Sequence, residues 1–231
     1  MSKVLAIIPA RIGSKRLKKK NIKLLDGKPL FIHSVEQAKK SKIFDEIHVS
    51  SESNTVINIC KKYKCNPQFK RPKKFATDNS SLEDVCKYVV NEYAKKNIFF
   101  DIICIIWATS PLRNVDDLRK SFKIICKKNI NAVVSVTGYD LPFHCGQILD
   151  KKNKLEMVFP NLMWLPTSKA PKAVCDNGSF VFVRTNAFLK YKSWMPPKTY
   201  GYEMPKSRSV DLDTKEDWNY LEYLYKRRTA K

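Results

Sequence analysis

The chain has 231 residues, 43% of them apolar and 29% charged, and a chain of this length can bury a core without disulfides or metal. Its apolar runs fall far short of the ~18–20 residues that cross a bilayer, and the N-terminal run is too short for a signal peptide, so we expect a cytoplasmic protein without membrane contact. Its seven scattered cysteines contain no Cys-x-x-Cys pair, so we expect neither a zinc ribbon nor a redox motif. A formal net charge of +22 favours anionic ligands such as nucleotides, acidic sugars or nucleic acid, although lysines spread along a whole chain can also lack a function.

Short apolar runs alternate with helical patterns through the first 136 residues. In chain order the patterns predict a strand at 3–8, a helix at 29–41, a strand at 46–50, helices at 53–63 and 80–96, a strand at 101–107, a helix at 115–128 and a strand at 131–136. Ser80 and Glu83 have the spacing of a capping box at the start of their helix. This order predicts an α/β fold with a mainly parallel sheet and helices on both faces.

The pattern changes at about residue 139. Two short strands joined by a turn at 150–154 are expected within 144–160, followed by a Pro-rich stretch and a strand at 177–183. We interpret residues 139–176 as a segment inserted into a single domain of residues 1–231, where it would form a lid or a subunit contact. A late strand at 207–213 and a helix at 214–227 complete the prediction.

The loop after the first strand carries six cations between residues 11 and 20. Ligands of parallel sheets bind at the carboxyl ends of the strands, and phosphate binding needs backbone N–H groups and cations that converge on one point. The loop contains neither a Walker A motif nor Gly-x-Gly-x-x-Gly. Arg11 follows the buried strand so closely that its side chain should lie at the sheet edge, whereas Lys18 and Lys19 also suit a solvated loop.

Asp211 and Asp213 are two residues apart on the expected late strand, so their carboxylates would lie on one face. Two like charges at this distance are unfavourable, and Mg²⁺ carrying substrate phosphates would relieve the repulsion. The alternative is that Asp213 caps the following helix and Asp211 is a surface acid.

Polar residues also follow the central strand and precede the helix at 80–96. Thr109, Ser110 and Arg113 could contact a ligand or form a plain turn, and Arg71 with residues 78–81 could bind a ligand or cap the helix. Nucleophilic catalysis is poorly supported, because there is no Gly-x-Ser-x-Gly motif and the three histidines have no triad context.

Several motifs in order match one known family. They are "ARIGSKRLKKKN", "NIKLLDGKPL", "FDEIHVSSES", "RP" with its following "A-x-D-x-SS", "ATSPLR", "NGSFVFV" and "SVDLDTKEDW". Over nearly its whole length the chain resembles the acylneuraminate cytidylyltransferases, whose relatives act on pseudaminic and legionaminic acids. The resemblance implies a Rossmann-like, three-layer nucleotidyltransferase that transfers CMP from CTP to the anomeric hydroxyl of a nine-carbon keto-sugar acid and releases pyrophosphate.

The resemblance also implies roles for particular residues. The expected catalytic residues are Arg11, Lys20 and Asp211. The expected CTP ligands are Arg11, Ser14, Lys15, Lys20, Asn21, Arg71 and Ser81. The expected sugar ligands are Trp107, Thr109, Ser110, Arg113, Lys169 and Asn177. Asp211 and Asp213 would hold Mg²⁺. Members of the family are usually homodimers in which the inserted segment reaches the neighbour's sugar site.

The sugar itself stays open. Trp107 and Ala108 stand where sialic acid enzymes have Gln-Pro and are closer to the pseudaminic branch, whereas "CDNGSFVF" keeps the Asn-Gly of the sialic and legionaminic branches. The Arg-x-Gln-type stretch before that strand is missing, and Lys169 could replace its carboxylate partner. The alternatives are a cytidylyltransferase for another acidic sugar such as Kdo, or a basic nucleic-acid-binding protein, which the absence of stacked-aromatic RNA motifs disfavours.

Overall fold

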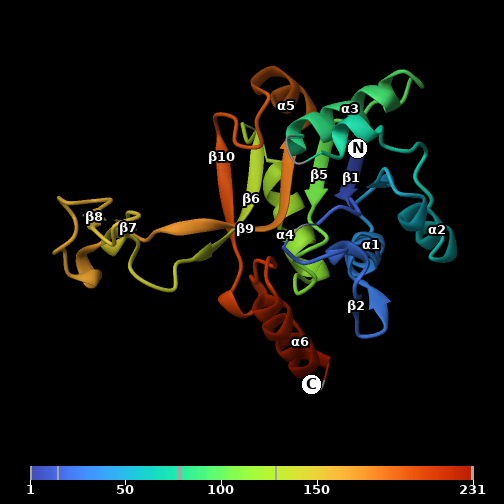
Figure 1. The fold of residues 1–231 in the computed structure, drawn as a ribbon. Coiled ribbons are helices and arrows are strands. Elements are labelled where there is room, and N and C mark those ends of the chain that lie inside the picture. Colours follow the sequence, from blue (N-terminus) through green and yellow to red (C-terminus); the bar gives the residue numbers. More distant parts are fainter. Residues whose placement is uncertain (1, 15, 78–79, 128, 230–231) are drawn as a thin grey trace.

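The computed structural model describes residues 2–14, 16–77, 80–127 and 129–229. A central β-sheet forms the middle layer of the fold (Figure 1). Its strand order is β10-β6-β9-β5-β1-β4. The bounds are β1 Val4–Pro9, β4 Glu46–Ser50, β5 Ile102–Ile106, β6 Ala132–Gly138, β9 Val174–Arg184 and β10 Thr199–Glu203. Only β9 among them runs antiparallel to its neighbours, β5 and β6, so the prediction of a mainly parallel sheet is confirmed.

Helices cover both faces of this sheet. Side chains of α1 Leu30–Ser41, α2 Asn54–Lys62 and α4 Val115–Ile125 share one core cluster, and those of α3 Leu82–Ala94 and α5 Thr185–Tyr191 share the other. Alternate residues of β1 enter opposite clusters, with Ala6 and Ile8 on one side and Leu5 and Ile7 on the other, as a strand buried on both faces requires. The predicted three-layer architecture is confirmed.

A third apolar cluster supports the last helix, α6 Lys215–Thr229, which lies below the sheet in Figure 1. Trp218 and Leu221 of α6 pack there with Leu25, Leu30 and Leu212. Leu25 belongs to a small hairpin of β2 Leu24–Leu25 and β3 Lys28–Pro29, whose turn has positive φ at Asp26 (48°) and Gly27 (73°). The cluster therefore holds residues 210–212 beside the loops that leave the sheet.

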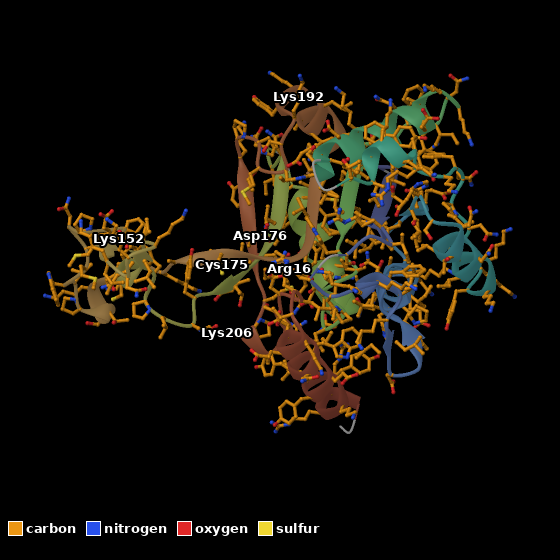
Figure 2. The ribbon with its side chains drawn as sticks, viewed as in Figure 1. Arg16, Lys152, Cys175, Asp176, Lys192 and Lys206 are labelled. Atoms are coloured by element: carbon orange, nitrogen blue, oxygen red, sulfur yellow. The ribbon has the colours of Figure 1, made fainter. Side chains whose placement is uncertain are left out.

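Residues 139–173 form an arm that projects from the sheet. The predicted pair of short strands is present as β7 Gln147–Leu149 and β8 Leu155–Met157. Figure 2 shows Lys152 at the far end of the arm, and Cys175 and Asp176 where the chain returns to the sheet. Large apolar side chains are exposed on it, with Trp164 83% and Leu141 78% accessible.

The predicted late strand at 207–213 is wrong. Residues Lys206–Arg208 form a 3-10 turn, and residues 209–213 have no regular secondary structure and pair with no strand. The alternation that suggested a strand is real, because Leu212 is buried in the third cluster and its neighbours are not. The remaining 3-10 turns are Lys20–Ile22, Lys73–Phe75, Phe143–Cys145 and Thr167–Lys169.

Within the described part of the chain, no helix combines the length and apolar character that crossing a membrane requires.

Candidate active site

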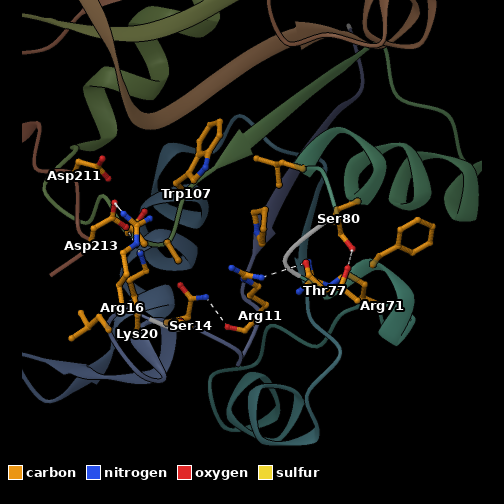
Figure 3. A pocket seen from close by; sticks show the side chains of 18 residues that line it. Arg11, Ser14, Arg16, Lys20, Arg71, Thr77, Ser80, Trp107, Asp211 and Asp213 are labelled. Carbon is orange, nitrogen blue, oxygen red and sulfur yellow. Dashed lines mark hydrogen bonds and ion pairs between the residues drawn. The ribbon is translucent and has the colours of Figure 1, made fainter. Parts of the chain in front are cut away.

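The carboxyl-terminal edge of the sheet opens onto a cavity of about 780 Å³ (Figure 3). The segments that follow β1 and β5 line it, and three further segments complete its wall. Loops that follow parallel strands gather at this edge, so residues that are distant in the sequence meet there. The predicted site residues that line the cavity are Arg11, Ser14, Lys20, Asn21, Arg71, Trp107, Thr109, Asp211 and Asp213.

The opening loop is held in shape by its own hydrogen bonds. The N–H of Ala10 donates to the carbonyl oxygen of Ser50 at 2.9 Å, which fixes the exit from β1. Asn21 is 7% exposed, and its Nδ2 donates to the carbonyl oxygen of Arg11 at 2.8 Å, which closes the loop on itself. Arg11 reaches across the cavity, where its guanidinium donates to the Thr77 carbonyl oxygen at 3.4 Å. Asn21 therefore positions the loop, and Arg11 faces the space that the loop encloses.

The cations of the loop divide between the cavity and solvent. Lys20 and Arg16 line the cavity, whereas Lys18 and Lys19 are exposed and do not. Lys15, an expected phosphate ligand, lies outside the described residues. Arg16 had no role in the prediction, and only the structure places it in the site.

Asp213 faces these cations. Its Oδ1 lies 3.2 Å from the Nζ of Lys20, its Oδ2 lies 2.6 Å from a guanidinium nitrogen of Arg16, and Lys20 also donates to the Leu212 carbonyl oxygen at 2.6 Å. The alternative that Asp213 caps α6 is wrong. Thr214 is the cap, because its Oγ1 accepts the N–H of Asp217 at 3.2 Å and the Asp217 carboxylate accepts the N–H of Thr214 at 2.7 Å. The Asp213 carboxylate is thus available to the cavity.

Asp211 carries a carboxylate with no hydrogen-bond or ion-pair partner in the described part of the chain. Partial desolvation in the cavity and the negative charge of Asp213 raise the pKa of Asp211. A dication beside both carboxylates would reverse this shift. In the residues described, no three His, Cys, Asp or Glu side chains are grouped so that they could hold a metal ion, and the carboxylates that line this cavity are those of Asp211 and Asp213. That donor set fits Mg²⁺, which is commonly held by one or two carboxylates together with substrate phosphates.

The opposite end of the cavity contains Arg71. This side chain is 4% exposed, and one guanidinium nitrogen lies 2.8 Å from the Oε2 of Glu52. Thr77 and Ser80 lie at the same end of the cavity (Figure 3), and Phe75 also lines the cavity. Glu52 was absent from the prediction, although it lies two residues after the end of β4, just as Arg11 lies two residues after the end of β1.

Ser81, an expected CTP ligand, does not line the cavity. Its Oγ accepts the N–H of Asp84 at 3.0 Å and caps α3. The predicted capping box of Ser80 and Glu83 is therefore wrong, and the N-cap is Ser81, one residue later. Ser80 lines the cavity instead, where its hydroxyl is 2.8 Å from that of Thr77.

In the loop after β5, the first residues line the cavity and the later ones are buried. Trp107 and Thr109 line the cavity, whereas Ser110 is 2% exposed and Arg113 is fully buried behind it. Arg113 donates to the carbonyl oxygens of Trp107, Ser110 and Ser179 at 2.7–3.2 Å. Burial lowers the pKa of Arg113 to about 9. The expectation that Arg113 binds the sugar is not met, because the Pro111 turn directs it into the core, where it shapes the loop.

The last two expected sugar ligands lie away from the cavity of their own chain. Asn177 is 6% exposed and donates to the hydroxyl of Ser209 at 3.0 Å. Lys169 is exposed on the arm.

The match to a family model decides the family. The model described as cytidylyltransferase matches residues 5–228. The chain belongs to the cytidylyltransferase family. This cytidylyltransferase is 31% identical over 224 residues to the pseudaminic acid cytidylyltransferase of Campylobacter jejuni, with 97% of each chain covered. It is 30% identical to the CMP-N,N'-diacetyllegionaminic acid synthase of Legionella pneumophila, with 96% of each covered.

Solved structures show the same fold at lower identity. A CMP:2-keto-3-deoxy-manno-octonic acid synthetase complexed with CTP superposes with a TM-score of 0.74 at 15% identity and covers 98% of this cytidylyltransferase and 100% of that chain. A 4-diphosphocytidyl-2C-methyl-D-erythritol synthase from Anaerococcus prevotii gives a TM-score of 0.67 at 13% identity. At these identities the likeness concerns the fold, and it confirms the predicted nucleotidyltransferase architecture.

Proposed function

We propose that the chain transfers CMP from CTP to the anomeric hydroxyl of a sialic-acid-like nine-carbon keto-sugar acid and releases pyrophosphate. The observation that carries the proposal is the pairing, in one strand-end cavity, of Arg11 and Lys20 with two adjacent carboxylates, Asp211 and Asp213. Cations can neutralise a triphosphate, and carboxylates can hold the metal that accompanies it. The relatives named for pseudaminic and legionaminic acid support the sugar class.

In this reaction the sugar hydroxyl forms a bond to the α-phosphorus, and the bond from that phosphorus to the pyrophosphate oxygen breaks. Arg11 and Lys20 would neutralise the triphosphate, and Arg71 with Ser80 would hold the nucleoside end. Asp211 and Asp213 would hold Mg²⁺, which supplies charge neutralisation and lowers the pKa of the attacking hydroxyl. Arg16 and Lys20 keep Asp213 oriented beforehand. Positioning and electrostatic stabilisation are the main contributions, so no histidine base is required.

The acceptor sugar would lie between Trp107, Thr109 and the carboxylate pair. Lys169 lies outside the cavity of its own chain, so we assign it to the sugar site of a partner subunit in a homodimer joined through the arm. The cytoplasmic location remains a prediction.

An acceptor panel tests the function. Pyrophosphate release from CTP is measured with neuraminic, legionaminic, pseudaminic and Kdo-type acids, with Mg²⁺ and with a chelator. Release is expected only with a nine-carbon acid and with Mg²⁺, and Asp211→Asn should lose most of it, because one of two carboxylates can no longer hold the metal. Preferred turnover of the Kdo-type acid would replace the proposed acceptor, and full turnover in chelator would remove the metal from the scheme.

A further inference from the structure

Glu52 lies behind the cavity wall and joins two of its loops. It lies two residues after the end of β4, and its side chain is 12% exposed. Its Oε1 accepts the N–H of Ile12 at 3.0 Å, and its Oε2 lies 2.8 Å from a guanidinium nitrogen of Arg71. Ile12 is the residue after Arg11, so one carboxylate contacts both the phosphate-side loop and the nucleoside-side arginine.

Main-chain hydrogen bonds bring these loops together, but they do not fix the orientation of the Arg71 side chain. The N–H of Arg71 donates to the carbonyl oxygen of Ser51 at 3.0 Å, and that of Ala10 donates to Ser50. The Arg71 guanidinium has rotatable bonds beyond this anchor, and Glu52 is the described carboxylate that pairs with it. Arg113 is satisfied by carbonyl oxygens, but the acceptor that the Arg71 side chain contacts among the described residues is Glu52. Loss of this carboxylate would leave an uncompensated buried charge, so Glu52 also decides whether Arg71 stays in the cavity wall.

The geometry of Arg71 is suited to directional contacts. Its Nε is buried and has no hydrogen-bond partner among the described residues, and Glu52 occupies one of its terminal nitrogens. Burial opposes ionisation of Glu52, but the Ile12 N–H and the Arg71 guanidinium outweigh it and lower the pKa of the Glu52 carboxyl. The Glu52 carboxylate therefore stays ionised beside Arg71, and it balances the charge of that guanidinium.

We propose that Glu52 is a positioning residue for nucleotide binding, which orients Arg71 toward the nucleoside and fixes its spacing from the phosphate-binding loop. The inference rests on the proposed function in one respect, that the cavity binds CTP. A residue of this kind acts on recognition of the nucleoside more than on the triphosphate. The phosphate-binding loop is also held by the hydrogen bonds of Ala10 and Asn21, whereas Glu52 is the described carboxylate that pairs with Arg71.

The test compares Glu52→Gln with wild-type protein and with Glu92→Gln. Glutamine has the length of glutamate but one acceptor oxygen, so it can serve Ile12 or Arg71 but not both. Glu92 is the matched control, because it pairs with Lys95 on the outer side of α3, away from the cavity. Isothermal titration measures the dissociation constants of CTP and of inorganic triphosphate without sugar, and circular dichroism measures Tm.

We expect Glu52→Gln to weaken CTP binding about 10- to 100-fold and triphosphate binding less than threefold, with KM for CTP raised and KM for the sugar unchanged. Glu92→Gln should match wild type. If Glu52→Gln fails to fold, Glu52→Asp keeps the charge but is too short for both contacts, and the same selective loss is expected. Equal loss of CTP and triphosphate affinity, or none, would overturn the inference. Wild-type protein that bound no CTP would overturn the proposed function as well.

Discussion

Two buried arginines of this chain show how the same residue type takes different tasks. Arg113 is surrounded by carbonyl oxygens of the loop that it shapes, whereas Arg71 is paired with a carboxylate at the cavity wall. In the sequence both arginines stand near a proline beside a polar stretch. Only the backbone path separates them, because the turn at Pro111 directs Arg113 into the core.

His48 gives a pH-dependent contribution to stability. Burial, reinforced by the positive charges of Arg71 and Lys96, lowers the pKa of His48 to about 3, against about 6.5 in an unfolded chain. The unfolded state therefore binds an additional proton between these values, and the free energy of unfolding falls as the pH falls through 6.5. Between pH 7.5 and pH 5 the loss from this group should be about 2 kcal/mol.

His48→Phe removes the titration and keeps an aromatic ring against Phe69. Urea unfolding at both pH values should show that wild type loses about 2 kcal/mol more than the variant. Equal losses in the two proteins would mean that His48 is protonated within the folded state.

The paired aspartates could be predicted from the sequence, and Arg16 could not. The two aspartates lie on the same side of the chain because Leu212 between them is buried, and the apolar side chain of Leu212 is enough to predict its burial. Arg16 is one cation among six in its loop, and its contact with Asp213 spans 197 residues of sequence. Contacts of this range depend on how α6 is docked, which no local pattern encodes.

Neighbouring serines at the start of α3 should separate stability from binding. Ser81 caps the helix, so Ser81→Ala should lower the free energy of unfolding by about 1 kcal/mol and leave the KM for CTP unchanged. Ser80 lines the cavity and is its matched control, so Ser80→Ala should raise that KM with a smaller effect on stability. Urea titrations and initial rates measure both. If Ser81→Ala raised the KM for CTP and Ser80→Ala did not, Ser81 and not Ser80 would be the CTP ligand.

At the scale of elements, the layers were predictable and some neighbours were not. Buried strands such as "DIICIIW" and amphipathic helices identify themselves by apolar pattern, and their alternation implies the parallel sheet. The sequence does not show that β9 inserts antiparallel between β5 and β6, since a strand buried on both faces reads the same in either direction. The edge strand β10 was missed because most of its residues are exposed and it lacks an apolar run.

For the whole molecule, the arm predicts the state of assembly. Leu141 and Trp164 are exposed large apolar side chains on a projecting segment, a feature typical of association surfaces. We expect sedimentation velocity to give a dimer for wild type, and Trp164→Asp to shift it towards the monomer, because a charge would be buried in the contact. Tyr220→Asp is the control, since Tyr220 is an exposed aromatic on α6. A monomeric wild type at micromolar concentration would contradict the proposal.

The long strand β9 belongs to both the arm and the core. It has 11 residues, and at a rise of ~3.3 Å per residue its length is roughly 36 Å. One part is clamped between β5 and β6, with Ser179 bonded to Trp107 and Arg113, and the other part leads into the arm. The pairing of β9 with β6 shifts register between Val134 and Val136, and an irregularity of this kind bends the strands locally. In the dimer that we propose, a force on the arm would pass along β9 to the loop that carries Trp107, so binding of a second subunit would also adjust the proposed sugar site.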